Sequence, residues 1–176
     1  MVDRVKTRIE VNGVMQERWV EPRQHLVDYL RDELELKGTR VACEHGVCGA
    51  CTVRLDGEIV RGCLVLAVQA DGARVETIEG VSESGEIADL QDAFHAHNAL
   101  QCGFCTSGML LTAQDLAQKQ PAANRAAIRI HISGNYCRCT GYHAIVDAIA
   151  TTLDGRRDAV APSRAPRPVI DPLVNP

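Results

Sequence analysis

The N-terminal part of the chain contains short runs in which apolar and polar residues alternate. An alternation of this kind has the period of a β-strand with one buried face. Two of these runs meet at Asn12-Gly13 and two more at Asp56-Gly57, and both dipeptides favour two-residue hairpin turns. The pattern predicts strands at residues 5–11, 14–20, 52–55, 58–61 and 74–78.

The period changes between the two hairpins. Leu26, Leu30 and Leu34 recur every four residues, which predicts an amphipathic helix over about 23–36, with Gly38 at its end. A small sheet of hairpins crossed by one helix is the β-grasp layout of ferredoxins. We therefore predict a ferredoxin-like β-grasp domain over residues 1–80.

The rest of the chain has no comparable alternation and is typical of helices. Apolar residues recur at helical spacing in three stretches, and Asn124 can cap a further short helix after Pro121. Four short helices favour an all-α four-helix bundle over residues 81–160, with 79–85 as the linker. The expected fold class is α+β, with helices at about 87–100, 104–119, 124–132 and 141–153.

Residues 161–176 differ from both domains. Five of the seven prolines lie in this stretch, which has no hydrophobic period. Proline at this density prevents a helix and favours an extended chain. Two interpretations of this Pro-rich C-terminal tail stay open: a floppy terminus, or a segment that drapes over a partner subunit.

Composition and charge narrow the class of protein. The 176 residues are 45% hydrophobic, which is enough for a buried core, and the formal net charge of −4 argues against a nucleic-acid-binding surface. No apolar run approaches the 18 or more residues of a membrane span, and the charged first residues resemble no export signal. We therefore expect a soluble, cytoplasmic protein.

The chain has eight cysteines, and four fall in each half. A chain of this length does not need disulfides to fold, and clustered thiols in a reducing compartment indicate metal ligands or redox groups. The first four are Cys43, Cys48, Cys51 and Cys63; the second four are Cys102, Cys105, Cys137 and Cys139.

The first four cysteines have the C-x4-C-x2-C spacing, plus one distant cysteine, of a plant-type 2Fe-2S ferredoxin. The predicted hairpin pairs Leu55 with Glu58, so Cys63 returns opposite Ala50 and beside Cys51. Zinc is the alternative, because four thiolates also suit a structural zinc site, but zinc ribbons use two short-spaced pairs. The spacing favours iron–sulfur, and His45 is interpreted as a loop residue.

The second four cysteines give a weaker signal. A lone C-x2-C pair can bind zinc, act as a redox dithiol or hold an iron–sulfur cluster. Both pairs precede predicted helices, whose N-termini favour anionic thiolates, and the intervening residues form one helix out and one helix back. The placement favours a second 2Fe-2S cluster and leaves zinc open.

The two blocks together resemble the iron–sulfur (small) subunits of molybdenum hydroxylases, the xanthine oxidase family. The segment 43–53, CEHGVCGACTV, is similar to the first signature of that family. The segments 101–106, QCGFCT, and 134–142, GNYCRCTGY, are similar to the second. The resemblance covers roughly residues 5–155.

This resemblance implies roles for the matching positions. The first four cysteines would ligate the cluster nearer a flavin, and the second four the cluster nearer molybdenum. Gln101 and Cys139 match positions that lie against the pterin cofactor and hydrogen-bond to it. No residue of this chain is expected to be catalytic, and His95 and His97 are interpreted as solvated.

The resemblance also implies partners and a function. The chain would be the non-catalytic iron–sulfur subunit of an oxidoreductase, in a heterotrimer or a dimer of heterotrimers. A large subunit would hold molybdenum on a molybdopterin dinucleotide, and a medium subunit would bind FAD. Electrons would pass from the molybdenum site through two 2Fe-2S clusters to FAD. The alternatives are a stand-alone ferredoxin-like carrier and a zinc-stabilised interaction module.

Overall fold

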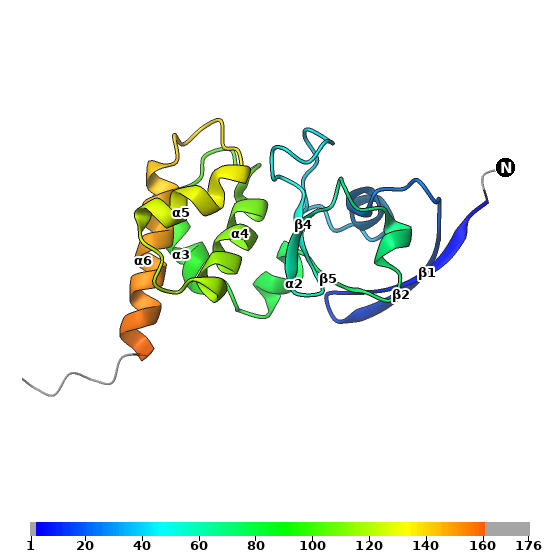
Figure 1. Cartoon of the computed structure of the whole chain (residues 1–176), viewed down its shortest axis with the longest axis horizontal. Helices are drawn as coiled ribbons and strands as arrows, with labels where there is room; N and C mark the ends of the chain where they lie inside the picture. The colour runs from blue at the N-terminus through cyan, green and yellow to red at the C-terminus, as the bar shows by residue number, and fades with distance from the viewer. Residues whose placement is uncertain (1–2, 161–176) are drawn as a thin grey trace, which may run out of the picture.

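The computed structural model describes residues 3–160, in which a β-sheet half and a helical half lie side by side (Figure 1). The predicted tail at 161–176 lies outside the described residues. Within the described range, the strands are β1 (Val5–Val11), β2 (Val14–Val20), β3 (Thr52–Leu55), β4 (Glu58–Arg61) and β5 (Arg74–Glu76). The first four match the predicted ranges, and β5 ends two residues before the predicted 78.

The strands form one mixed sheet in the order β2-β1-β5-β3-β4. Strand β5 is parallel to β1 and antiparallel to β3, so the last and short strand joins the two hairpins. The first hairpin turns at Asn12 and Gly13, whose φ angles of 50° and 79° are both left-handed, as a two-residue hairpin turn requires. The turn residues that predicted the hairpins therefore also form them.

The helix that crosses the sheet is shorter than predicted. It consists of α1 (Leu26–Asp28) and a π-helical turn, Tyr29–Glu33, rather than a helix over 23–36. The chain turns sharply at Glu35, which has a φ of 59°, but Leu34 and Leu36 still pack against the core from this turn. The leucine period therefore continues past the end of the helix. The core beneath it contains Ile9, Val11, Val20, Leu26, Tyr29, Leu30, Val53, Ala67, Ala70 and Val75.

The helical half, as far as residue 160, contains α2 (Ile78–Glu83), α3 (Ala88–Ala96), α4 (Thr106–Lys119), α5 (Arg125–His131) and α6 (His143–Val160). The predicted linker at 79–85 was wrong, because most of it is α2, whose Ile78 and Val81 are buried. The predicted cap was right: the Asn124 side chain accepts a hydrogen bond from Ala127 N at 3.0 Å.

Helix α4 is the element on which both halves pack. It contacts β3 and β4 on one side and α2, α3 and α5 on the other, and every residue from 108 to 117 is buried. A helix that is covered all round carries mostly apolar or small residues, and the buried polar side chains of α4 are paired: Gln114 with Glu86 and Arg156, and Asp115 with Lys119. Among residues 3–160, no helix combines the length and the apolar character needed to cross a membrane.

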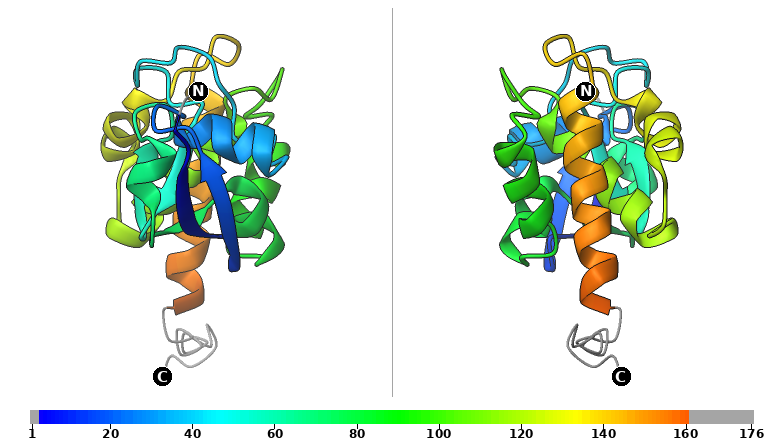
Figure 2. Two further views of the ribbon diagram at one scale, coloured as in Figure 1. Left: turned by 90° about the vertical axis from the view of Figure 1, so that its right-hand side faces the viewer. Right: turned by 90° about the vertical axis from the view of Figure 1, so that its left-hand side faces the viewer.

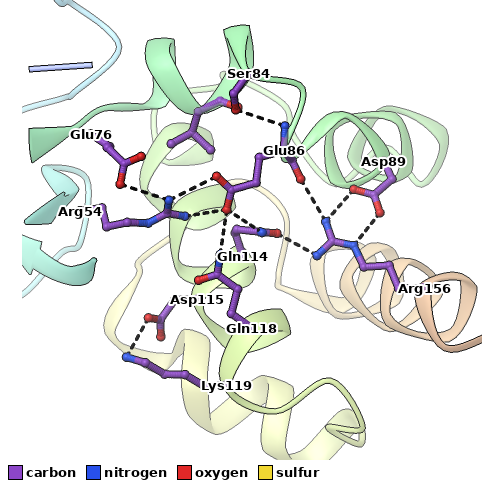
Figure 3. A network of polar contacts seen from close by, with 11 residues as sticks. Arg54, Glu76, Ser84, Glu86, Asp89, Gln114, Asp115, Gln118, Lys119 and Arg156 are labelled. Carbon is purple, nitrogen blue, oxygen red and sulfur yellow. Dashed lines mark hydrogen bonds and ion pairs between the residues drawn. The ribbon is translucent and has the colours of Figure 1, made fainter. Parts of the chain in front are cut away.

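A polar network also joins the halves (Figure 3). Glu86, between α2 and α3, accepts hydrogen bonds from Arg54 of β3 at 3.0 and 3.2 Å and from Gln114 of α4 at 2.8 Å. Arg156 of α6 bonds Asp89 at 2.6 and 2.7 Å and Gln114 at 2.9 Å. The network therefore connects the sheet with three elements of the helical half.

Candidate metal centres

The cysteines lie on four connecting loops, namely those that precede β3, follow β4, precede α4 and precede α6. The two larger loops, near residues 43–48 and 137–142, lie at the same end of the molecule, opposite the end of α6 (Figure 2). All eight cysteines fall within the described residues, and all are free thiols. The fold therefore collects at one end the groups that the sequence singled out.

The β3–β4 hairpin brings Cys63 to the loop that carries the other three cysteines of the first half. Leu55 pairs with Glu58 and Thr52 with Arg61, and Gly62 N donates to Cys51 O at 3.0 Å. The register that the sequence predicted is confirmed. Cys51 and Cys63 are buried, whereas Cys43 and Cys48 are partly exposed.

The four thiols of this first group occur as two pairs. Cys43 and Cys48 affect each other's ionisation, as do Cys51 and Cys63, and Cys48 also acts on Cys51. Backbone N–H groups of His45 and Cys48 point at the sulfur of Cys43 and lower its pKa to about 6. Burial raises the pKa of Cys51 to about 11. One thiolate is therefore stabilised by the loop itself, and the other needs a metal cation nearby in order to ionise.

The second group has the same arrangement in pairs. The Sγ atoms of Cys102 and Cys139 are 3.6 Å apart, and the side chains of Cys105 and Cys137 interact. Thr140 donates to Cys137 Sγ from its N at 3.4 Å and from its Oγ1 at 3.2 Å. The α3–α4 and α5–α6 loops are therefore brought together. The sequence predicted this, because the residues between the two cysteine pairs were expected to form one helix out and one helix back.

Burial and hydrogen bonds act in opposite directions on this second group. Burial raises the pKa of Cys105 to about 12. Burial also opposes ionisation of Cys137, but the donors of Thr140 and of the Cys139 backbone outweigh it, so its pKa is lowered. The adjacent Cys102 thiol raises the pKa of Cys139.

The Cys102–Cys139 pair fits the geometry of two thiolates bound to one metal. Two thiolates that bind one tetrahedral metal at about 2.3 Å lie roughly 3.8 Å apart, close to the separation of Cys102 and Cys139. A 2Fe-2S cluster takes four cysteine thiolates, which two pairs can supply, one pair for each iron. In residues 3–160, no three Cys, His, Asp or Glu side chains form a compact group around one point where a single ion could sit.

The other residues singled out from the sequence lie as follows. Gln101 and Cys139 are brought together: Gln101 Nε2 donates to Cys139 O at 3.0 Å, and both residues are exposed. His45 is a loop residue whose ring contacts Cys43 O. His95 is exposed, and His97 is half-buried, with its Nε2 3.1 Å from Thr151 Oγ1 in an exposed contact.

Sequence reasoning missed Asn135 and Tyr142, which hold the second thiol loop. Asn135 is 1% exposed, and its backbone O accepts from the Tyr142 hydroxyl at 3.3 Å. The same hydroxyl accepts from Cys137 N at 2.8 Å. Their position inside the segment 134–142 was the available signal, but the residue types alone do not indicate a scaffolding role.

Two family models match the chain in succession. The model described as "2Fe-2S iron-sulfur cluster binding domain" matches residues 9–77, and the one described as "[2Fe-2S] binding domain" matches residues 77–150. Each model covers one of the two thiol groups.

Relatives in curated collections match over most of their length. The chain is 55% identical over 141 residues to the 6-hydroxypseudooxynicotine dehydrogenase complex subunit beta of Paenarthrobacter nicotinovorans, covering 80% of this chain and 88% of that protein. It is 52% identical to the caffeine dehydrogenase subunit gamma of Pseudomonas sp. (strain CBB1), covering 80% and 86%.

Solved structures agree with these relatives. The chain matches a chain of quinoline 2-oxidoreductase from Pseudomonas putida 86 with a TM-score of 0.82 and 46% identity, over 90% of this chain and 99% of that one. It matches aldehyde oxidoreductase from Desulfovibrio gigas with a TM-score of 0.80 and 39% identity, over 88% of this chain and 17% of that one.

Proposed function

The chain belongs to the iron–sulfur subunits of the molybdenum hydroxylase family, and on this premise we propose that it conducts electrons between the partner subunits of an oxidoreductase complex. A 2Fe-2S cluster, when bound, takes up and releases one electron at a time. The observation that carries the proposal is the gathering of eight free thiols into two groups of two pairs.

We assign one cluster to each group. Cys43, Cys48, Cys51 and Cys63 would hold the first cluster, and Cys102, Cys105, Cys137 and Cys139 the second. Donors already point at the sulfur atoms, since Cys48 N lies 3.4 Å from Cys43 Sγ and Thr140 N lies 3.4 Å from Cys137 Sγ. Such N–H groups stabilise anionic sulfur and tune the potential of a cluster.

We further propose which cluster faces which partner. The second cluster would lie toward the molybdopterin dinucleotide of a large subunit, and the first toward FAD in a medium subunit, in a heterotrimer or its dimer. Gln101 and Cys139 would contact the pterin, which their shared exposure and their mutual hydrogen bond support. Electrons would then leave the large subunit through the helical half and reach FAD through the sheet half.

Three finer features remain our proposals. The division at residues 1–80 and 81–160 is supported by the two successive family matches, although α2 crosses residue 80. The second domain would behave as a four-helix bundle made of α3, α4, α5 and α6. A cytoplasmic location stays a prediction of the sequence.

Metal and sulfide analysis of anaerobically purified protein tests the proposal. We expect about four iron and four inorganic sulfide per chain, with two paramagnetic signals after full reduction. Stoichiometric zinc without sulfide would contradict the proposal and support the zinc-stabilised module. A carrier that acts alone would purify without a molybdenum-containing subunit, whereas we expect that subunit to co-purify. Neither alternative is favoured by the relatives, which are subunits of complexes.

A further inference from the structure

The two thiol groups meet through a direct backbone contact. Cys48 O, in the loop of the sheet half, accepts a hydrogen bond from Tyr136 N at 2.8 Å. Tyr136 directly precedes Cys137. This single bond therefore joins Cys48, which carries a thiol of the first group, to the residue next to Cys137, which carries a thiol of the second group. The contact lies between residues far apart in sequence, and other groups must therefore hold it in place.

Asn135 is the first of these groups. Its side chain is buried, Nδ2 donates to Gly49 O at 3.2 Å, and Oδ1 accepts from Thr112 Oγ1 at 3.0 Å. The same Oδ1 accepts from Arg61 Nη2 at 3.2 Å. One amide therefore bonds to the first thiol loop, to helix α4 and to strand β4, and buried polar networks with all partners in place are rigid.

Arg61 completes the contact from the sheet side. It ends β4, two residues before Cys63, and its Nη2 also donates to Gly134 O at 2.9 Å. Its Nη1 donates to Thr52 Oγ1. The planar guanidinium thus connects the hairpin that positions Cys63 with the loop that leads to Cys137, and a lysine could not reproduce this fork of donors.

The backbones at this junction approach so closely that side chains are excluded. A Cβ at Gly49, where φ is +76°, would lie 2.6 Å from Gly134 O. A Cβ at Gly108 of α4 would collide with Gly49 O. Glycine is therefore required at both positions. The backbones are packed so closely that the loops cannot shift and still keep their contacts.

We propose that Arg61 and Asn135 form an interdomain latch, a pair of positioning residues that fix the separation of the two centres and hence the rate at which an electron crosses between them. The inference rests on the proposed function. With both clusters bound, one electron would pass from the cluster held by the helical half to the cluster held by the sheet half. No proton moves and no covalent bond changes. Because such transfer weakens steeply with distance, a fixed junction has a direct kinetic consequence.

Amide hydrogen exchange on the cluster-loaded chain tests the latch without any activity assay. The variant Asn135→Ala should exchange the Tyr136 amide roughly 30-fold faster, the factor expected for loss of its two hydrogen bonds to the sheet half, those with Gly49 and Arg61. The matched control is Glu58→Ala, which removes another contact between β4 and α4, the ion pair with Lys119 at 2.6 Å. Control exchange at Tyr136 should equal that of the wild type. Equal exchange in Asn135→Ala and the control would overturn the latch.

A spectroscopic arm measures the separation itself. In fully reduced wild-type protein the two paramagnetic centres should split each other's signals. Asn135→Ala and Arg61→Ala should lose or broaden this splitting while keeping iron content and both individual signals, and Arg61→Lys should restore it in part. An unchanged splitting in both alanine variants would overturn the latch. A wild type with only one signal would instead contradict the proposed function, and the exchange arm would still decide the latch.

Discussion

Replacing Glu86 by alanine should destabilise the folded chain by about 2 kcal/mol. Arg54, which is 6% exposed, would lose its two shortest charged hydrogen bonds, at 3.0 and 3.2 Å. Removing one partner of a fully buried pair costs about 3–5 kcal/mol. We expect less here, because the Glu86 side chain is 28% exposed and Arg54 keeps Glu76 at 3.4 Å.

The ionisation of Glu86 fixes the pH range of this effect. Burial alone would raise the pKa of Glu86, but hydrogen bonds from Arg54 and Gln114 outweigh burial and lower it below 4.5. A carboxyl with a lowered pKa contributes its stability above its unfolded pKa and loses it as the pH falls through its folded pKa. The cost of Glu86→Ala should therefore be the same at pH 7 and pH 8, and should shrink only below about pH 4.5.

Urea unfolding of the anaerobic, cluster-loaded chain measures this cost. In a thermal scan it corresponds to a fall in Tm of roughly 4–8 °C. The control Glu58→Ala removes an exposed ion pair between the same two halves and should leave the midpoint almost unchanged. A Glu86→Ala midpoint equal to that of the control would refute the reasoning. It would mean that leaving the buried Arg54 guanidinium without Glu86 has no cost in stability.

Four further predictions concern the thiol loops and the helices α4 and α6. Cys48→Ser should remove one paramagnetic signal and leave the signal of the helical half, and loss of both would contradict independent assembly. Gln101→Ala should slow reduction of the clusters by substrate in single-turnover measurements while iron content stays constant; an unchanged rate would contradict the pterin contact. Gly108→Ala should destabilise the chain by about 1–3 kcal/mol because its Cβ would collide with Gly49 O. Gly155→Ala, where a Cβ meets nothing within 4 Å, should stabilise α6 by about 0.5–1 kcal/mol, and equal melting temperatures of these two variants would contradict the packing argument.

Local signals explain which parts of the fold were predictable. The hairpins depend on dipeptides whose residues adopt the left-handed conformation in the structure, such as Asn12-Gly13, and the neighbouring alternation sets their strands. The length of the helix over 23–36 was overestimated. Leu34 and Leu36 pack against the core from a turn, so buried leucines continue at the spacing of a helix after the helix has ended. Helix α2 was missed because a helix of six residues shows only two buried positions.

The candidate site was predictable in its elements and not in its contacts. The spacing of the cysteines pointed to two thiol groups, and the hairpin register correctly brought Cys63 beside Cys51. The role of Arg61 depends on Asn135, which is 74 positions away in the sequence. No local pattern encodes a contact of that range, because it arises only when α4 packs the two halves together.

The central place of β5 in the sheet has a consequence for synthesis of the protein. The hairpins β1–β2 and β3–β4 leave the ribosome before the strand that lies between them, so each nascent hairpin exposes an open edge. These edges close only once Arg74–Glu76 has emerged, immediately before the helical half begins. A polypeptide truncated upstream of Arg74 would therefore retain two unpaired edges and would be prone to aggregate with its own copies.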